Sequence, residues 1–170
     1  MSPYKKYKSM RLLHYNYSSE GYYFITICTK DRKNIFGKIL ENKMQLNKYG
    51  KIVKRQWLWL EKQYPYVNLD KYIIMPNHFH GIVIINKTGV GAGHDPHLPK
   101  IKIKPLTQLI GAFKTTSSKL IHQNGFLEFR WQRSFYDRII KNEKSLNNIR
   151  EYIILNPLKW DYDRNNPKNN

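Results

Sequence analysis

The spacing of apolar residues switches between strand-like and helix-like patterns along this chain of 170 residues. Runs of aromatic and β-branched residues are typical of strands, and apolar residues three or four positions apart are typical of helices. The expected strands are 22–29, 71–75 and 80–85, and the expected helices are 48–63, a segment opened by Pro105, and 143–155. This order predicts an α+β domain whose mostly antiparallel sheet is covered by helices on one face.

The segments between these elements contain turn-forming residues. Residues 41–43 join two short apolar runs and predict a hairpin, and FLEFRW at 126–131 predicts another short strand. Residues 86–100 contain Gly and Pro without apolar periodicity, which predicts a mobile loop. Pro65 and Pro157 are expected to end the first and last helices. We expect one domain over 1–170, with flexible ends at about 1–10 and 161–170.

The balance of charge indicates a polyanionic partner. Thirty Lys and Arg residues against twelve Asp and Glu residues give a formal net charge of +18 and an isoelectric point of about 9.9. A positive field of this size attracts polyanions, and nucleic acid is the obvious one. The alternatives are an anionic membrane surface and a basic surface that only confers solubility. The basic residues are scattered rather than gathered on one amphipathic helix, which argues against the membrane.

The sequence contains no pattern that directs a chain to or across a membrane. No apolar run approaches the roughly 20 residues that a membrane span needs. The basic start MSPYKKYKSM leads into no apolar signal-peptide segment. The single cysteine, Cys28, excludes an internal disulfide framework and fits a reducing cytoplasm.

His78 and His80 lie where a turn becomes a strand. Side chains two positions apart in a strand point to the same face, so the two imidazoles converge while Phe79 faces the other way. Apolar residues flank the pair on both sides, and polar groups in such surroundings need partners. Backbone hydrogen bonds are one answer. The other is a divalent metal, for which two histidines supply half of a site.

The last predicted helix brings a tyrosine and a carboxamide to one face. Tyr152 and Asn156 are four residues apart, beside the apolar stripe that contains Ile149. Asn156 offers an oxygen that could complete a site made by two histidines. Tyrosine can be a covalent nucleophile, but its pKa near 10 requires help from a cation or a base. The commoner role for a tyrosine so placed is an amphipathic residue at the boundary of the core, and Tyr136 is a rival candidate for the nucleophile.

Three segments together resemble the REP-associated branch of the single-tyrosine transposases. YIIMPNHFHGIVII resembles the histidine-hydrophobic-histidine (HUH) segment of that family, and IREYIILNP resembles its tyrosine helix. QLIGAFKTTSSKL resembles the helix that precedes the tyrosine region. The resemblance runs from about Arg11 to Trp160 in the expected order. It implies a ferredoxin-like α+β domain.

The resemblance also implies a bacterial cytoplasmic enzyme that uses Mg²⁺ or Mn²⁺ to cut and rejoin single-stranded or hairpin-forming DNA. His78 and His80 would then be metal ligands, and Tyr152 would attack phosphorus to give a 5′-phosphotyrosine and a free 3′-hydroxyl. Asn156 takes the position of a metal-binding glutamine in the insertion-sequence branch, and Pro157 after it follows the REP-associated pattern. Members of the two branches act as dimers or as monomers, so we expect a monomer or a homodimer.

Cationic side chains near these motifs are candidates for DNA contact. The candidates are Lys114, Lys119, Arg130, Arg133 and Arg138. Two further hypotheses stay open. A nucleic-acid-binding module that keeps the fold would bind without cutting. A replication-initiator or relaxase-type HUH nuclease usually contains larger partner regions, for which this chain has no room.

Overall fold

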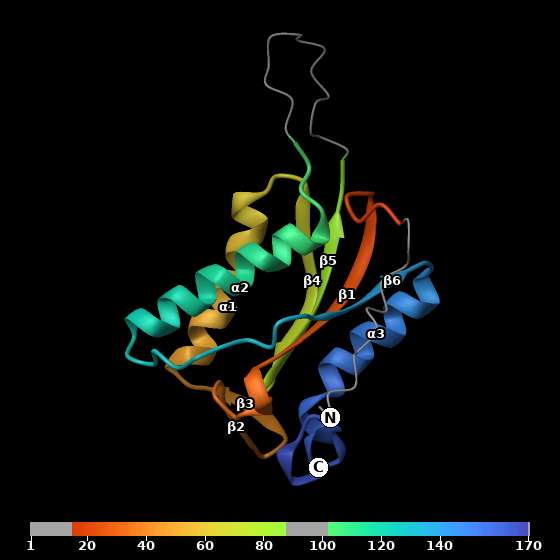
Figure 1. Ribbon diagram of the computed structural model, residues 1–170. Helices are drawn as coiled ribbons and strands as arrows, with labels where there is room; N and C mark the ends of the chain where they lie inside the picture. Colours follow the sequence, from red (N-terminus) through yellow and green to blue (C-terminus); the bar gives the residue numbers. More distant parts are fainter. Residues whose placement is uncertain (1–14, 88–101, 170) are drawn as a thin grey trace, which may run out of the picture.

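The protein is built on an antiparallel sheet, seen in a computed structural model that describes residues 15–87 and 102–169 (Figure 1). Within these ranges the sheet has four strands in the order β4-β5-β1-β6, and each neighbouring pair is antiparallel. The strands are β1 (Gly21–Cys28), β4 (Val67–Ile74), β5 (His78–Ile85) and β6 (Tyr136–Ile140). The three predicted strands are therefore confirmed. The end expected to be flexible at 1–10 and nearly all of the loop expected at 86–100 lie outside the described residues.

The helices begin and end at the capping residues that the sequence supplies. They are α1 (Lys48–Gln63), α2 (Leu106–Gln123) and α3 (Glu143–Leu155). The Asn47 side chain accepts hydrogen bonds from the first turn of α1, and that of Asn142 accepts one from the first turn of α3. Pro105 directly precedes α2, and Tyr64 before Pro65 ends α1. The predicted bounds of the first and last helices agree with the structure.

The order of elements produces a ferredoxin-like unit. The chain runs β1, α1, β4, β5, α2, β6, and this sequence with its sheet order is the βαββαβ arrangement. Helices α1 and α2 cover one face of the sheet, where Trp57, Phe79 and Phe113 form the centre of the larger core. The rings of Trp57 and Phe79 lie 4.5 Å apart, and those of Phe79 and Phe113 lie 5.4 Å apart. Phe79 therefore lies beneath the helices, as strand alternation predicts.

The third helix packs on the opposite face of the sheet (Figure 1). Leu146, Ile149 and Ile153 of α3 contact Phe24 of β1 and Ile82 of β5 in a second, smaller core. The expectation that the helices cover one face holds for α1 and α2 and is wrong for α3. The cause is the strand pattern itself, because β1 and β5 place apolar side chains on both faces of the sheet.

Residues 37–46 form the predicted hairpin. Strands β2 (Gly37–Leu40) and β3 (Lys43–Leu46) pair in antiparallel register. The two residues between them, Glu41 and Asn42, have φ values of 48° and 59°. Two successive positive φ values are characteristic of the tight turns that match strand twist.

The strand expected at 126–131 is wrong, and β6 occupies the sheet edge instead. Phe129 donates a backbone hydrogen bond to Phe126 in a turn, and within this stretch only Trp131 forms an isolated bridge, to Thr29. Phe129 and Trp131 are buried against Phe36. The apolar residues of this segment thus reach the core from irregular backbone rather than by strand alternation.

The end expected to fray at 161–170 is folded over its described part. It contains the 3₁₀ helices η2 (Pro157–Tyr162) and η3 (Pro167–Asn169), and Asn165 and Asn166 are buried between them. The Asn166 side chain donates to the carbonyl of Trp160. Polar side chains of this segment form hydrogen bonds to backbone groups, so the segment can pack on the protein although its residues are polar. Over the described ranges, no helix combines the length and apolar character that a membrane crossing requires.

Candidate metal centre and tyrosine site

His78 and His80 lie side by side at the start of β5, on the face of the sheet that α3 covers. Their ring centroids are 4.6 Å apart. Both side chains are almost fully buried, with exposed fractions of 0% and 2%. The convergence predicted from strand alternation is therefore present. The pair lies inside the protein and not on an exposed rim.

Asn77 orients the His78 ring. The His78 Nδ1–H donates to Oδ1 of Asn77 at 2.9 Å, because a carboxamide oxygen can only accept. The Asn77 amide nitrogen is held in turn by the carbonyls of Arg32 and Asn165, at 2.8 and 2.6 Å. A neutral His78 therefore presents an unprotonated Nε2. Metal-binding histidines commonly donate their other ring nitrogen to such an oxygen, which fixes the ring and its tautomer.

Thr26 holds the His80 ring in a similar way. The Thr26 hydroxyl lies 2.7 Å from Nδ1 of His80, and the Tyr152 hydroxyl lies 3.3 Å from Nε2. A ring protonated on Nδ1 donates to Thr26 and leaves Nε2 to accept from the phenol. With this tautomer of His80, both histidines direct an Nε2 lone pair toward the space beside α3.

Asp163 from the C-terminal tail lies at the same place, and it was missed in the sequence. Its Oδ2 is 3.7 Å from Nε2 of His78. One ligand atom from each of His78, His80 and Asp163 falls within 4.8 Å of the other two, so the three residues could hold a metal ion. The signal was absent from local patterns, since Asp163 stands in the polar segment that was expected to fray.

Asn156 contributes a second oxygen to this cluster. It is 3% exposed, and its Oδ1 is buried without a hydrogen-bond partner, as is Nε2 of His78. Unpartnered buried acceptors are costly, and a cation among them would remove the cost. A set of two imidazoles, a carboxylate and a carboxamide oxygen suits a divalent ion. The residues present therefore fit a metal.

The buried surroundings keep the histidines neutral and the tyrosine protonated. Burial lowers the pKa of both His78 and His80, while the Asp163 carboxylate acts in the opposite direction on His78. Burial raises the pKa of Tyr152, Asp163 raises it further, and the Asn156 amide lowers it. Neutral imidazoles are the form that binds metal. The phenol, by contrast, needs a nearby positive charge to become a nucleophile.

Tyr152 bridges the buried site and the solvent. Its hydroxyl reaches His80, yet 42% of the side chain is exposed. The edge of its ring meets Phe24 at a centroid distance of 6.1 Å. The residue is therefore partly open to solvent, while its hydroxyl lies against a buried histidine. Tyr136, the rival tyrosine, lies on β6 opposite Thr26 and packs against the smaller core.

The predicted DNA-contacting residues fall into separate regions. Lys114 bonds within the protein, because its ammonium donates to the carbonyls of Gln132 and Arg133. Lys119 is exposed on α2. Arg138 is exposed on β6 and pairs in register with Phe24, on the face of the histidines. Arg130 and Arg133 are exposed in the segment that follows α2, at a distinct groove described below.

Comparison with solved structures agrees with this fold. The match to the structure of a REP-associated tyrosine transposase bound to a REP hairpin covers 96% of this chain and 77% of the transposase chain, with a TM-score of 0.57 and 18% sequence identity. At this identity the likeness establishes the architecture. The chain has the fold of that transposase, and the resemblance predicted from the motifs is confirmed at this level.

Comparison by sequence places the chain among related proteins. An uncharacterised protein of Haemophilus influenzae is 40% identical over 164 residues, which is 92% of this chain and 91% of the relative. No protein-family model matches the sequence. The chain belongs to the same family as the Haemophilus influenzae protein.

Proposed function

We propose that the protein is a metal-dependent single-strand DNA endonuclease and strand transferase, with Tyr152 as its nucleophile. One observation carries the proposal. The Tyr152 hydroxyl lies 3.3 Å from Nε2 of His80, inside a cluster that also contains Asp163 and the unpartnered oxygen of Asn156. A nucleophile beside a set of metal ligands suits metal-assisted attack on a phosphodiester.

The metal would be held by His78, His80 and Asp163, with Asn156 as a further oxygen ligand. Mixed nitrogen and oxygen donors are compatible with Mg²⁺ or Mn²⁺. When bound, such an ion supplies Lewis-acid polarisation of a phosphate oxygen. Asn77 and Thr26 would fix the two imidazoles from behind and so keep the ligands in place before substrate arrives.

In the proposed reaction the Tyr152 oxygen attacks the phosphorus of a phosphodiester. The new bond is tyrosine oxygen to phosphorus, and the bond that breaks joins phosphorus to the 3′ oxygen. The phenol proton passes to water, which reaches the half-exposed ring, and the departing 3′ oxygen takes up a proton. Attack by a 3′-hydroxyl on the phosphotyrosine reverses the steps and joins strands.

Two findings support DNA as the substrate. The net charge of +18 favours a polyanion. The solved transposase with the same fold is bound to a REP hairpin, which makes single-stranded or hairpin-forming DNA the substrate to test first. Such a substrate would be met in the bacterial cytoplasm, by a monomer or a homodimer.

The test is to trap the covalent product. Labelled hairpin DNA is incubated with the protein and Mn²⁺ or Mg²⁺, and products are separated under denaturing conditions. We expect a protein–DNA adduct with the wild type and with Tyr136→Phe, and no adduct with Tyr152→Phe or without metal. Adducts that persist in Tyr152→Phe would refute the assignment. DNA binding without any adduct, unaffected by metal, would instead indicate a non-catalytic binding module.

A further inference from the structure

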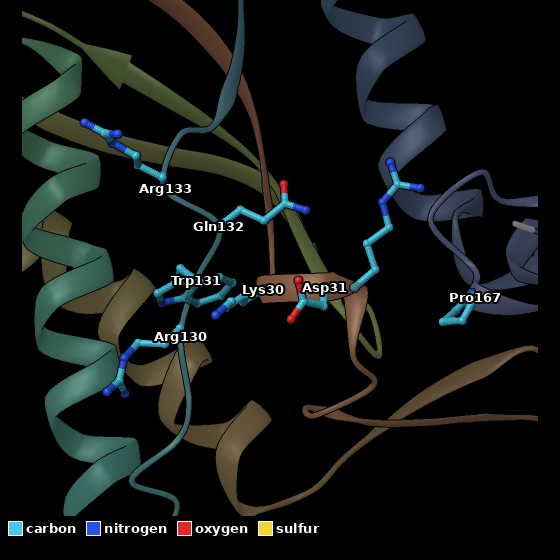
Figure 2. Close-up of a pocket in the computed structure, with 8 residues that line it drawn as sticks. Lys30, Asp31, Arg130, Trp131, Gln132, Arg133 and Pro167 are labelled. Carbon is cyan, nitrogen blue, oxygen red and sulfur yellow. The ribbon is translucent and has the colours of Figure 1, made fainter. Parts of the chain in front are cut away.

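A basic groove lies next to the candidate metal centre and is used by none of the steps above. It has a volume of about 960 Å³. Figure 2 shows its two walls, one formed by the turn after β1 and the other by the segment after α2, with Pro167 of the tail facing them. The lining residues are Lys30, Asp31, Arg32, Arg130, Trp131, Gln132, Arg133 and Pro167.

Backbone hydrogen bonds and a buried ring hold the two walls together. The amide of Lys30 donates to the carbonyl of Arg130, and the amide of Gln132 donates to that of Cys28, each at 2.9 Å. Trp131 is only 8% exposed, and its indole N–H donates to Ser117 of α2. The Lys114 ammonium secures the far end of this wall through two carbonyls. The groove is therefore a rigid part of the fold.

The groove carries four cationic side chains and one carboxylate, Asp31. Arg130 donates to the carbonyls of Leu127 and Phe129, and Arg32 donates to that of Arg164. Lys30 and Arg133 are exposed, and within residues 15–87 and 102–169 their side chains make no hydrogen bond or ion pair. These two side chains can bind an anion without breaking an existing contact.

The groove and the metal centre share a wall. The carbonyl of Arg32, in the groove turn, accepts from Asn77, and Asn77 accepts from the ring of His78. The C-terminal tail also connects the two places, since Asp163 lies at the metal centre and Pro167 lines the groove. A chain-like ligand could therefore run from one to the other along the surface.

We propose that this groove binds the phosphodiester backbone of the single strand that continues from the metal centre. This inference rests on the proposed function, because it assigns the course of that same substrate. Among the described residues that line the groove, Trp131 has the only aromatic ring, and its 8% exposed fraction leaves little face for a base to stack on. The groove thus recognises phosphates and not base identity. The substrate of the proposed function is single-stranded, so the occupant assigned to the groove is one strand.

The experiment measures binding of a fluorescent oligothymidylate of about 20 nucleotides, which forms no hairpin, to the full chain in EDTA. The groove variant is Lys30→Gln with Arg133→Gln. The matched control is Lys54→Gln with Arg55→Gln, which removes the same charge from exposed positions on α1. We expect the groove variant to bind at least about tenfold more weakly and the control about as well as wild type. The negative slope of log affinity against log salt should become shallower by about 1.4 for two lost phosphate contacts.

Equal losses in the two variants would overturn the proposal, because the effect would then come from net charge alone. An equal loss for a duplex of the same length would overturn the assignment to a single strand. EDTA prevents the metal-dependent reaction, so these results do not depend on cleavage. If no Tyr152 adduct forms, the proposed nuclease activity is refuted, but the effect of the groove variant on binding can still be measured. If the adduct forms and the groove variant binds like wild type, only the groove proposal is refuted.

Discussion

Arg150 of α3 binds the carboxylate of Asp70 on β4 through two nitrogens, Nε at 2.9 Å and Nη2 at 2.6 Å. This pair joins the third helix to the edge strand of the sheet, two residues before the candidate nucleophile. The apolar residues of α3 bury one side of the helix. The ion pair adds a fixed direction, so the angle at which Tyr152 meets His80 depends on it.

The first prediction concerns this pair. Arg150→Met removes two charge-assisted hydrogen bonds that both end on Oδ2 of Asp70. Because Arg150 is partly exposed, the loss should lower the free energy of unfolding by only about 0.5–1 kcal/mol, measured in urea. Adduct formation should slow by more than DNA binding weakens, because Tyr152 is displaced while the basic surfaces are intact. Arg150→Lys should restore only part of the rate, since one ammonium cannot replace the two guanidinium nitrogens that donate to Oδ2 of Asp70. Equal effects on binding and on adduct formation would contradict a positioning role.

The second prediction tests Asp163 as a metal ligand. Asp163→Asn replaces a carboxylate by a weaker neutral donor and should reduce Mn²⁺ affinity at least about tenfold, measured by calorimetry. Asp161→Asn is the matched control, because Asp161 is exposed in the same tail. Wild-type protein should also gain thermal stability with Mn²⁺, as any ligand of the native state confers. Wild-type affinity in Asp163→Asn would remove the residue from the site.

The third prediction concerns Asn77, which fixes the His78 tautomer. In the metal-free protein, nitrogen NMR should show His78 protonated on Nδ1, as the bond to the Asn77 oxygen requires. Asn77→Ala should abolish this preference, weaken metal binding by about 10- to 100-fold and destabilise the protein. Asn68→Ala, at an exposed position on β4, should change neither property. Protonation on Nε2 in the wild type would contradict the proposed ligand geometry.

The fourth prediction addresses the scaffold beneath the site. A Cβ added at Gly81 would lie 2.7 Å from the Trp57 ring and 2.8 Å from that of Phe79. Gly81→Ala should therefore cost about 1–3 kcal/mol of stability in urea unfolding. Gly111→Ala on α2 is the control, because no atom lies within 4 Å of the added carbon. That substitution should stabilise the protein by about 0.5–1 kcal/mol. A stable Gly81→Ala protein would show that the larger core adjusts.

Local sequence signals were sufficient for much of the fold. The first helix is marked by Asn47 and Pro65, and its apolar stripe repeats at one period throughout, so its bounds could be predicted. The same is true of α3, between Asn142 and Pro157. The segment 126–131 and the strand β6 are both short and apolar, and only the open edge of β1 decides which of them pairs. That choice depends on tertiary contacts and not on local pattern.

The candidate site likewise contains residues that local sequence patterns predict and one that only tertiary contacts place. His78, His80, Tyr152 and Asn156 follow from strand alternation, helix spacing and the motif resemblance, and the structure brings all four together. Asp163 could not be predicted, because its position depends on how Asn165 and Arg164 bond to Asn77 and Arg32. A polar tail carries no periodic signal that reports such contacts.

The attachment of α3 to the smaller core has a consequence for motion. The histidines belong to a strand buried between two neighbours. The tyrosine belongs to a helix whose described attachments to the sheet are a limited apolar surface, the Arg150–Asp70 ion pair and the Tyr152–His80 hydrogen bond. Partial unfolding begins where the least surface is buried. Amide hydrogens of α3 should therefore exchange with solvent sooner than those of β5. The protein would lose its candidate nucleophile transiently while both imidazoles stay in place, so the population of docked α3 would limit the rate of the proposed reaction at Tyr152.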